Sequence, residues 1–214
     1  MKATKKISVF ILFFCLTISL QSQNSIKAKK LLDDASVQIN SYENYEFDFK
    51  YILENSKENI RQETSGKIIV MGEKYKLSTT GIIQLFDGDK LYTIIPENEE
   101  VLITDSSSGD EIITNPGKLI ELYKTGYDFY WDISQNVTGN YIQYVKLIPT
   151  EENLDVMYIL LGINIKTKDV YKLIEIGKQR TTTTLSILNF KTNKNISSSI
   201  FNFNETDYPG YYID

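Results

Sequence analysis

The stretch from Gly81 to Thr104 constrains the fold more than any other part of the sequence. Its three short apolar runs are separated by two turn signals, Asp87-Gly88 and Pro96-Glu97-Asn98. An Asp-Gly pair between apolar runs favours a type I′ hairpin turn, because glycine adopts positive φ without steric cost. The stretch therefore predicts three antiparallel strands in a row, and such a meander has an apolar face that must be covered.

Many other segments have the two-residue period of a strand. From Tyr45 to Leu53, aromatic and apolar residues alternate with mostly charged ones, which is typical of a strand with one buried face. Further strand-like segments are residues 60–71, 74–79, 128–134, 141–148, 155–165, 170–176, 182–190 and 197–203. Within the second strand, Gly66 indicates a bulge or a close approach of another group. A sheet of about eleven strands tends to curl.

Two segments have the period of a helix. Residues 25–40 place Ala28, Leu31, Leu32, Ala35 and Ile39 on one face. A second, short helix is predicted to start at Asn115-Pro116, with Asn as N-cap and Pro at the first helical position, and to stop at Gly126. Its apolar side consists of Leu119, Ile120, Leu122 and Tyr123.

The N-terminus has the pattern of a cleaved signal peptide. Three lysines precede an apolar run from Ile7 to Leu20, and polar residues 21–23 follow it. This run is shorter than a comfortable membrane span. We therefore expect residues 1–23 to be removed, and residues 24–214 to form one domain outside the cytoplasm. Removal of three lysines and no acidic residue would lower the net charge from −5 to −8.

Composition excludes several function classes. The sequence has no histidine, and its one cysteine, Cys15, lies in the predicted signal peptide. Histidine-based triads, cysteine nucleophiles, cysteine-based metal sites and HExxH zinc sites are therefore absent from the predicted mature chain. The acidic charge argues against nucleic acid as a partner. We expect no catalytic residues, no metal and no cofactor.

An apolar binding pocket is a hypothesis that these elements allow. The predicted sheet is larger than two helices can mask, and a curled sheet partly roofed by helices encloses an apolar pocket. The aromatic residues, which include 15 tyrosines and 10 phenylalanines, line such a pocket in one interpretation and fill the core in the other. Core packing is the commoner role of aromatic residues in β proteins.

The order of the motifs resembles the periplasmic outer-membrane lipoprotein carrier family, the LolA-like proteins. The resemblance covers nearly all of residues 24–214. It rests on six motifs: A-x-x-L-L-D at Ala28–Asp33, F-x-F at Phe47–Phe49, the D-G-x-K-L-Y stretch ending at Pro96, Asn115-Pro116, the strand ending at Pro149, and Ile163-Asn164-Ile165. The sequence departs from the family at Gly72-Glu73, where members often have an Arg-Pro pair whose arginine holds the lid closed. That role cannot be assigned here.

The resemblance implies a mainly β fold: an incomplete, curved antiparallel barrel with a helical lid over an apolar cavity. It implies a monomeric periplasmic carrier that takes acylated lipoproteins from an inner-membrane transporter to an outer-membrane acceptor. The residues expected to face the cavity are Phe47, Phe49, Tyr51, Leu119, Ile120, Leu122 and Tyr123. The alternative is a non-enzymatic interaction or sensor domain of the same fold that binds another amphiphile or a protein partner.

Overall fold

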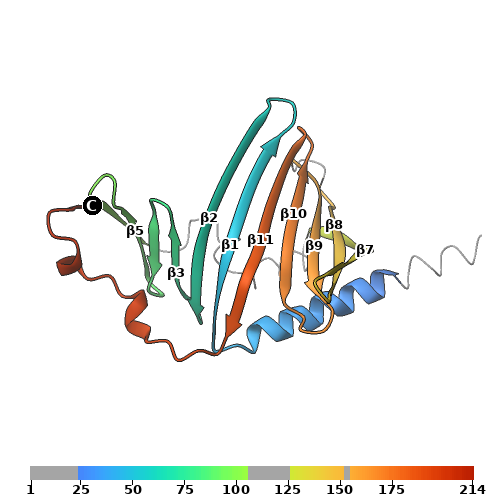
Figure 1. The fold of residues 1–214 in the computed structure, drawn as a ribbon, viewed down its shortest axis with the longest axis horizontal. Coiled ribbons are helices and arrows are strands. Elements are labelled where there is room, and N and C mark those ends of the chain that lie inside the picture. The colour runs from blue at the N-terminus through green and yellow to red at the C-terminus, as the bar shows by residue number, and fades with distance from the viewer. Residues whose placement is uncertain (1–23, 106–125, 152–154) are drawn as a thin grey trace, which may run out of the picture.

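One curved, open sheet of twelve strands dominates the computed structural model (Figure 1). The structure describes residues 24–105, 126–151 and 155–214. The strands are β1 (Asn44–Asn55), β2 (Ile60–Met71), β3 (Lys74–Thr79), β4 (Ile83–Phe86), β5 (Lys90–Ile95), β6 (Glu100–Asp105), β7 (Tyr127–Val137), β8 (Asn140–Pro149), β9 (Val156–Asn164), β10 (Val170–Gly177), β11 (Thr181–Thr192) and β12 (Tyr212–Ile213). The expected mainly β, incomplete barrel is confirmed.

The strand order explains why the sheet stays open. Antiparallel pairing runs from β6 through β1 and continues from β1 through β11 to β7, while β12 pairs with β6 in parallel. Strands β7 and β12 are therefore the two edges, and they do not pair with each other. The central strands β1, β2 and β11 are the longest, at 12 residues each.

The face that carries Phe47, Phe49 and Tyr51 is called the inner face. Cross-strand pairs fix the same side in the neighbouring strands, because Phe47 lies opposite Ile68, and Ile68 lies opposite Leu77. The opposite, outer face of β1 and β2 carries charged residues. This alternation is the one that the period of two predicted.

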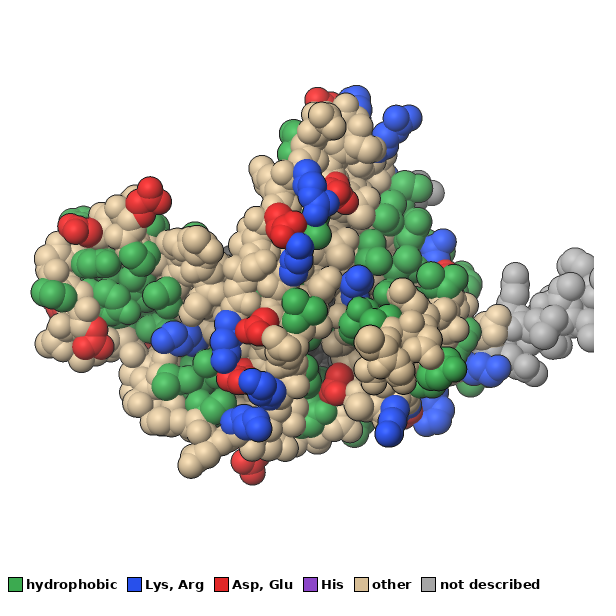
Figure 2. Space-filling model, in the orientation of Figure 1, with side chains coloured by type: hydrophobic (Ala, Val, Ile, Leu, Met, Phe, Trp, Pro, Cys, Tyr) green, Lys and Arg blue, Asp and Glu red, His purple; other side chains and the backbone are tan. Residues whose placement is uncertain are grey.

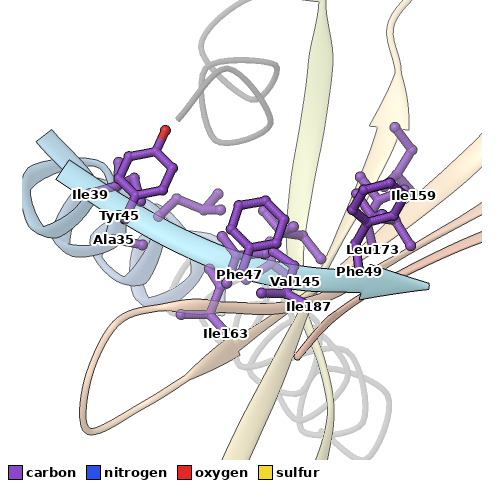
Figure 3. Close-up of a cluster of buried hydrophobic side chains, with 14 of the residues drawn as sticks. Ala35, Ile39, Tyr45, Phe47, Phe49, Val145, Ile159, Ile163, Leu173 and Ile187 are labelled. Carbon is purple, nitrogen blue, oxygen red and sulfur yellow. The ribbon is translucent and has the colours of Figure 1, made fainter. Parts of the chain in front are cut away.

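The helix at residues 24–40 covers part of the inner face. All five predicted apolar residues of the helix are buried and belong to one cluster with β1, β2, β3, β8, β9, β10 and β11. Figure 3 shows Ala35 and Ile39 beside Tyr45, and the rings of Phe47 and Phe49 farther along β1. The helix is thus fixed by its apolar side, as the sequence predicted.

A second core lies on the outer face of β4, β5 and β6. Leu85, Ile94 and Val101 are buried there, and Phe203, Tyr208, Tyr211 and Ile213 of the C-terminal segment pack over them. The rings of Tyr92 and Phe203 stack with centroids 4.8 Å apart. The sheet therefore buries opposite faces in its two halves.

Three local predictions were wrong. Residues 197–203 form no strand but a 3₁₀ turn, η2 (Ser198–Phe201), because the Ser197 hydroxyl accepts a hydrogen bond from the Ser199 amide. The C-terminal residues 207–214, in which no strand was expected, contain β12. At Asp87-Gly88 only Gly88 has positive φ, whereas a type I′ turn needs two such residues; the Asp87 carboxylate instead accepts the amides of Asp89 and Lys90.

Candidate functional site: the inner face of the sheet

The inner face is continuous with the core, and the structure places the predicted β1 residues on it. The side chains of Phe47 and Phe49 are 1% and 3% exposed, while Tyr51 is half-buried and packs at the margin of the cluster. In Figure 3, Phe47 lies near Val145 and Ile187, and Phe49 lies beside Leu173 and Ile159. Leu119, Ile120, Leu122 and Tyr123 lie outside the described residues, so the cavity-lining set stays a prediction.

Gly66 positions Phe49. The two residues are direct partners in the β1–β2 ladder, and the Phe49 ring occupies the space above Gly66. A Cβ at this position would lie 2.4 Å from the Ser78 carbonyl oxygen and 2.7 Å from Phe49 Cζ. The close approach that the sequence indicated at Gly66 is therefore real, and it lets the phenylalanine ring lie flat over the sheet.

Half-buried aromatic residues surround the packed part of the inner face. Tyr42 and Phe190 are two of them, near the end of the helix. The other five are Tyr51 on β1, Tyr75 on β3, and Tyr127, Phe129 and Trp131 on β7. We call these five residues the aromatic margin. The three on β7 follow one another at every second position, so the two-residue period was the signal that would have found them. Each of these side chains is thus only partly covered by the packed cluster.

Glu175 is the acidic group of this face in strand β10. It follows Leu173 at a spacing of two and lies opposite Ile159 of β9 and Thr183 of β11. Burial raises the pKa of its carboxyl. Burial, and then the negative charge of Glu175, raise the pKa of Tyr127.

The outer face of the central strands is charged instead. Glu46 pairs with Lys67 at 2.9 Å and with Lys191 at 3.4 Å, and the hydrogen bond from Lys67 is the main reason that the pKa of Glu46 is lowered. Lys50 and Arg61 both pair with Glu63. Figure 2 shows basic and acidic side chains interspersed over the tall central strands. The buried apolar side chains of these strands thus lie on their inner side.

The described parts of the chain have neither a metal-binding cluster nor a membrane-spanning helix. Residues 24–105, 126–151 and 155–214 contain no cluster of acidic, histidine or cysteine side chains that could hold a metal ion. Within the same residues, no helix has the length and apolar character needed to cross a bilayer.

Comparison with solved structures places the fold. An uncharacterised conserved protein from Thermus thermophilus matches with a TM-score of 0.59 at 8% identity, over 88% of this chain and 98% of that chain. LprF from Mycobacterium bovis matches with a TM-score of 0.53 at 11% identity, over 81% and 97%. These two likenesses show that the chain has their fold.

The LolA superfamily protein NE2245 from Nitrosomonas europaea is also among the structural neighbours, with a TM-score of 0.45 at 11% identity over 82% of this chain and 97% of that one. No protein-family model matches the sequence. No curated protein matches it either.

Proposed function

We propose that this protein is a carrier that binds the acyl chains of lipoproteins on its inner face and shuttles them from the inner to the outer membrane. The observation that carries the proposal is the aromatic margin. Its residues lie on β1, β3 and β7, on the same face as the packed core, and remain only half-buried. A purely structural sheet of this size would gain stability by burying them completely.

The energetics favour reversible binding. Each CH₂ group that moves from water into the apolar space contributes about 0.8 kcal/mol. The half-buried carboxyl of Glu175 and the helix at residues 24–40 limit this gain, since the helix already occupies part of the face. A cover that competes with the ligand lowers the apparent affinity, which a carrier needs in order to release its cargo.

The remaining parts of the proposal come from the sequence. Removal of residues 1–23 would deliver residues 24–214 to the periplasm as a single domain. The resemblance to lipoprotein carriers suggests an inner-membrane transporter as donor and an outer-membrane protein as acceptor. Transfer of this kind breaks no bond, so the proposed role is non-enzymatic.

Binding of a fluorescent acyl probe tests the inner face. Phe129→Glu places a charge among the aromatic margin, whereas Tyr130→Glu places it one residue away on the other face, where Tyr130 is 43% exposed. We expect Phe129→Glu to weaken probe binding at least tenfold and Tyr130→Glu to leave it unchanged. Equal affinities of both variants would overturn the inner-face assignment.

Native mass spectrometry of protein recovered gently from the cell envelope identifies the cargo class. We expect bound acylated peptides. Bound glycolipid or free lipid would favour the alternative role of an amphiphile-binding domain of the same fold. Protein that is always empty, with no cross-link to lipoproteins, would reject the carrier function.

A further inference from the structure

A groove at the edge of the packed core lies between the helix at residues 24–40 and the neighbouring ends of β7, β8 and β9. Its volume is about 390 Å³. The floor is apolar and consists of Leu31 from the helix with Trp131, Ile142 and Ile165 from the sheet. Tyr141 stands at the lip, where its side chain is 58% exposed.

The bulge in β7 shapes one wall of this groove. The regular pairing with β8 is interrupted between Trp131 and Ser134. The buried amide of Gln143 holds the bulge, because its nitrogen donates to the carbonyl oxygens of Asp132 at 2.8 Å and Ile133 at 3.1 Å. Trp131 and Gln143 therefore have fixed positions in the groove wall.

The rim of the groove is basic in a protein that is otherwise acidic. Lys27, Lys30 and Lys168 line it, together with the single carboxylate of Asp34. Asp34 pairs with Lys30 at 3.1 Å and with Lys168 at 3.7 Å. Lys27 is exposed and forms no ion pair within the part of the chain that the structure describes. The rim thus carries an excess of two positive charges, against a net charge of −5 for the chain.

We propose that this groove is a second ligand site, which binds one molecule of a single-chain anionic amphiphile. Its alkyl chain lies on the floor formed by Leu31, Trp131 and Ile165. Its carboxylate or phosphate head lies at the rim near Lys27 and Lys168. The groove shares Trp131 with the aromatic margin. The inference does not rest on the carrier function, because Ile165 and the charges of Lys27 and Lys168 lie outside that margin.

The size of the groove favours a monomeric amphiphile over a membrane surface. A cavity of about 150 Å³ holds a benzene molecule, and by this scale 390 Å³ holds one chain of roughly fifteen carbons. Ligand pockets of about 300–1,000 Å³ are usual for small molecules. An anionic bilayer would meet the net negative charge of the whole chain, which opposes stable adsorption.

Trp131 supplies the readout, since it is the single tryptophan of the sequence. We would titrate the protein with decanoate and with decyl phosphate, each as monomers, and follow Trp131 emission. Decanol and decylammonium are the neutral and cationic controls. We expect saturable binding of both anionic probes, at least tenfold weaker binding of the other two, and weaker anionic binding as NaCl screens the rim.

Variants separate the groove from the inner face. Lys27→Glu reverses an exposed charge at the rim and should weaken decanoate binding about tenfold, while Lys90→Glu reverses an exposed charge on β5 and should have no effect. Ile165→Gln, at a residue that is 43% exposed, should weaken all four probes.

Three results would overturn the proposal. The first is equal binding of anionic and neutral probes. The second is binding to anionic vesicles with none to monomers. The third is loss of decanoate binding in Tyr51→Glu together with normal binding in Lys27→Glu, which would place the chain on the inner face. Failure of the inner-face test with Phe129→Glu, by contrast, leaves the groove intact.

Discussion

At the scale of single residues, Gly66 links the sequence to the geometry of the inner face. Gly66→Ala introduces a Cβ that collides with the backbone oxygen of Ser78 and with the Phe49 ring. We expect this variant to lose about 1–3 kcal/mol of unfolding free energy, the usual cost of overpacking. Urea denaturation measures the loss. Ser65→Ala, on the same strand and the opposite face, is the control and should cost far less.

The ionisation of Glu175 should make the folding stability of the protein depend on pH. Because burial raises the pKa of its carboxyl above the ordinary value of 4.5, the folded protein binds a proton there more readily than the unfolded chain does. The stability contributed by the protonated carboxyl is present at pH values below the unfolded pKa and is lost as pH rises through the raised one.

Replacement by glutamine removes this dependence. Glu175→Gln should match the wild type at pH 4 and exceed it in urea midpoint at pH 8. Glu73→Gln, an exposed turn residue, provides the comparison at both pH values. A stability gap that is the same at pH 4 and pH 8 would contradict the role of the buried charge.

At the scale of elements, the C-terminal segment acts as the cover of the outer core. The Phe203 ring stacks on both Tyr92 and Tyr208, at 4.8 and 5.4 Å between centroids. Phe203→Ala should therefore cost roughly 2 kcal/mol, somewhat less than a fully buried phenylalanine. Hydrogen exchange should quicken in β5 and β6 and stay slow in β1. Tyr212→Ala, at a side chain that is 64% exposed, should change neither.

The sequence predicts those elements that are determined by residues close together in the chain, and it misses those that depend on distant segments. The helix at residues 24–40 follows from its 3.6-residue period. The strands β1 to β11 follow from two-residue alternation or from short apolar runs between turn signals. The strand β12 has two residues, and it exists because Ile213 meets Val101 from a distant segment. Local patterns cannot encode such a pairing.

The candidate site also has features that the local sequence predicts and features that depend on distant segments. Phe47 and Phe49 were correctly placed on one face of a strand, but the period does not tell whether a ring is packed or free to meet a ligand. That distinction comes from the Gly66 contact and from strands remote in sequence, such as β8 and β9. The groove at Lys27 and Lys168 is formed by a helix and by a turn more than a hundred residues farther along the chain. No local sequence motif predicts it.

At the scale of the whole molecule, the sheet holds two cores on opposite faces, and binding is expected to couple to its stability. A ligand that binds only the folded protein stabilises it by about 2.7 kcal/mol at a concentration one hundred times its Kd. In a chain of this size, that gain corresponds to a rise in Tm of roughly 5–10 °C.

Thermal unfolding in the presence of a ligand can therefore test where the acyl chain binds. An acylated peptide should raise the Tm of the wild type and of Tyr130→Glu by this amount, because both keep the aromatic margin. Phe129→Glu should show a normal circular dichroism spectrum and little Tm rise, since the charge on the inner face would have to be buried beside the chain. The same peptide without its acyl chain is the ligand control. A Tm rise in Phe129→Glu equal to that of the wild type would mean that the acyl chain binds elsewhere on the molecule.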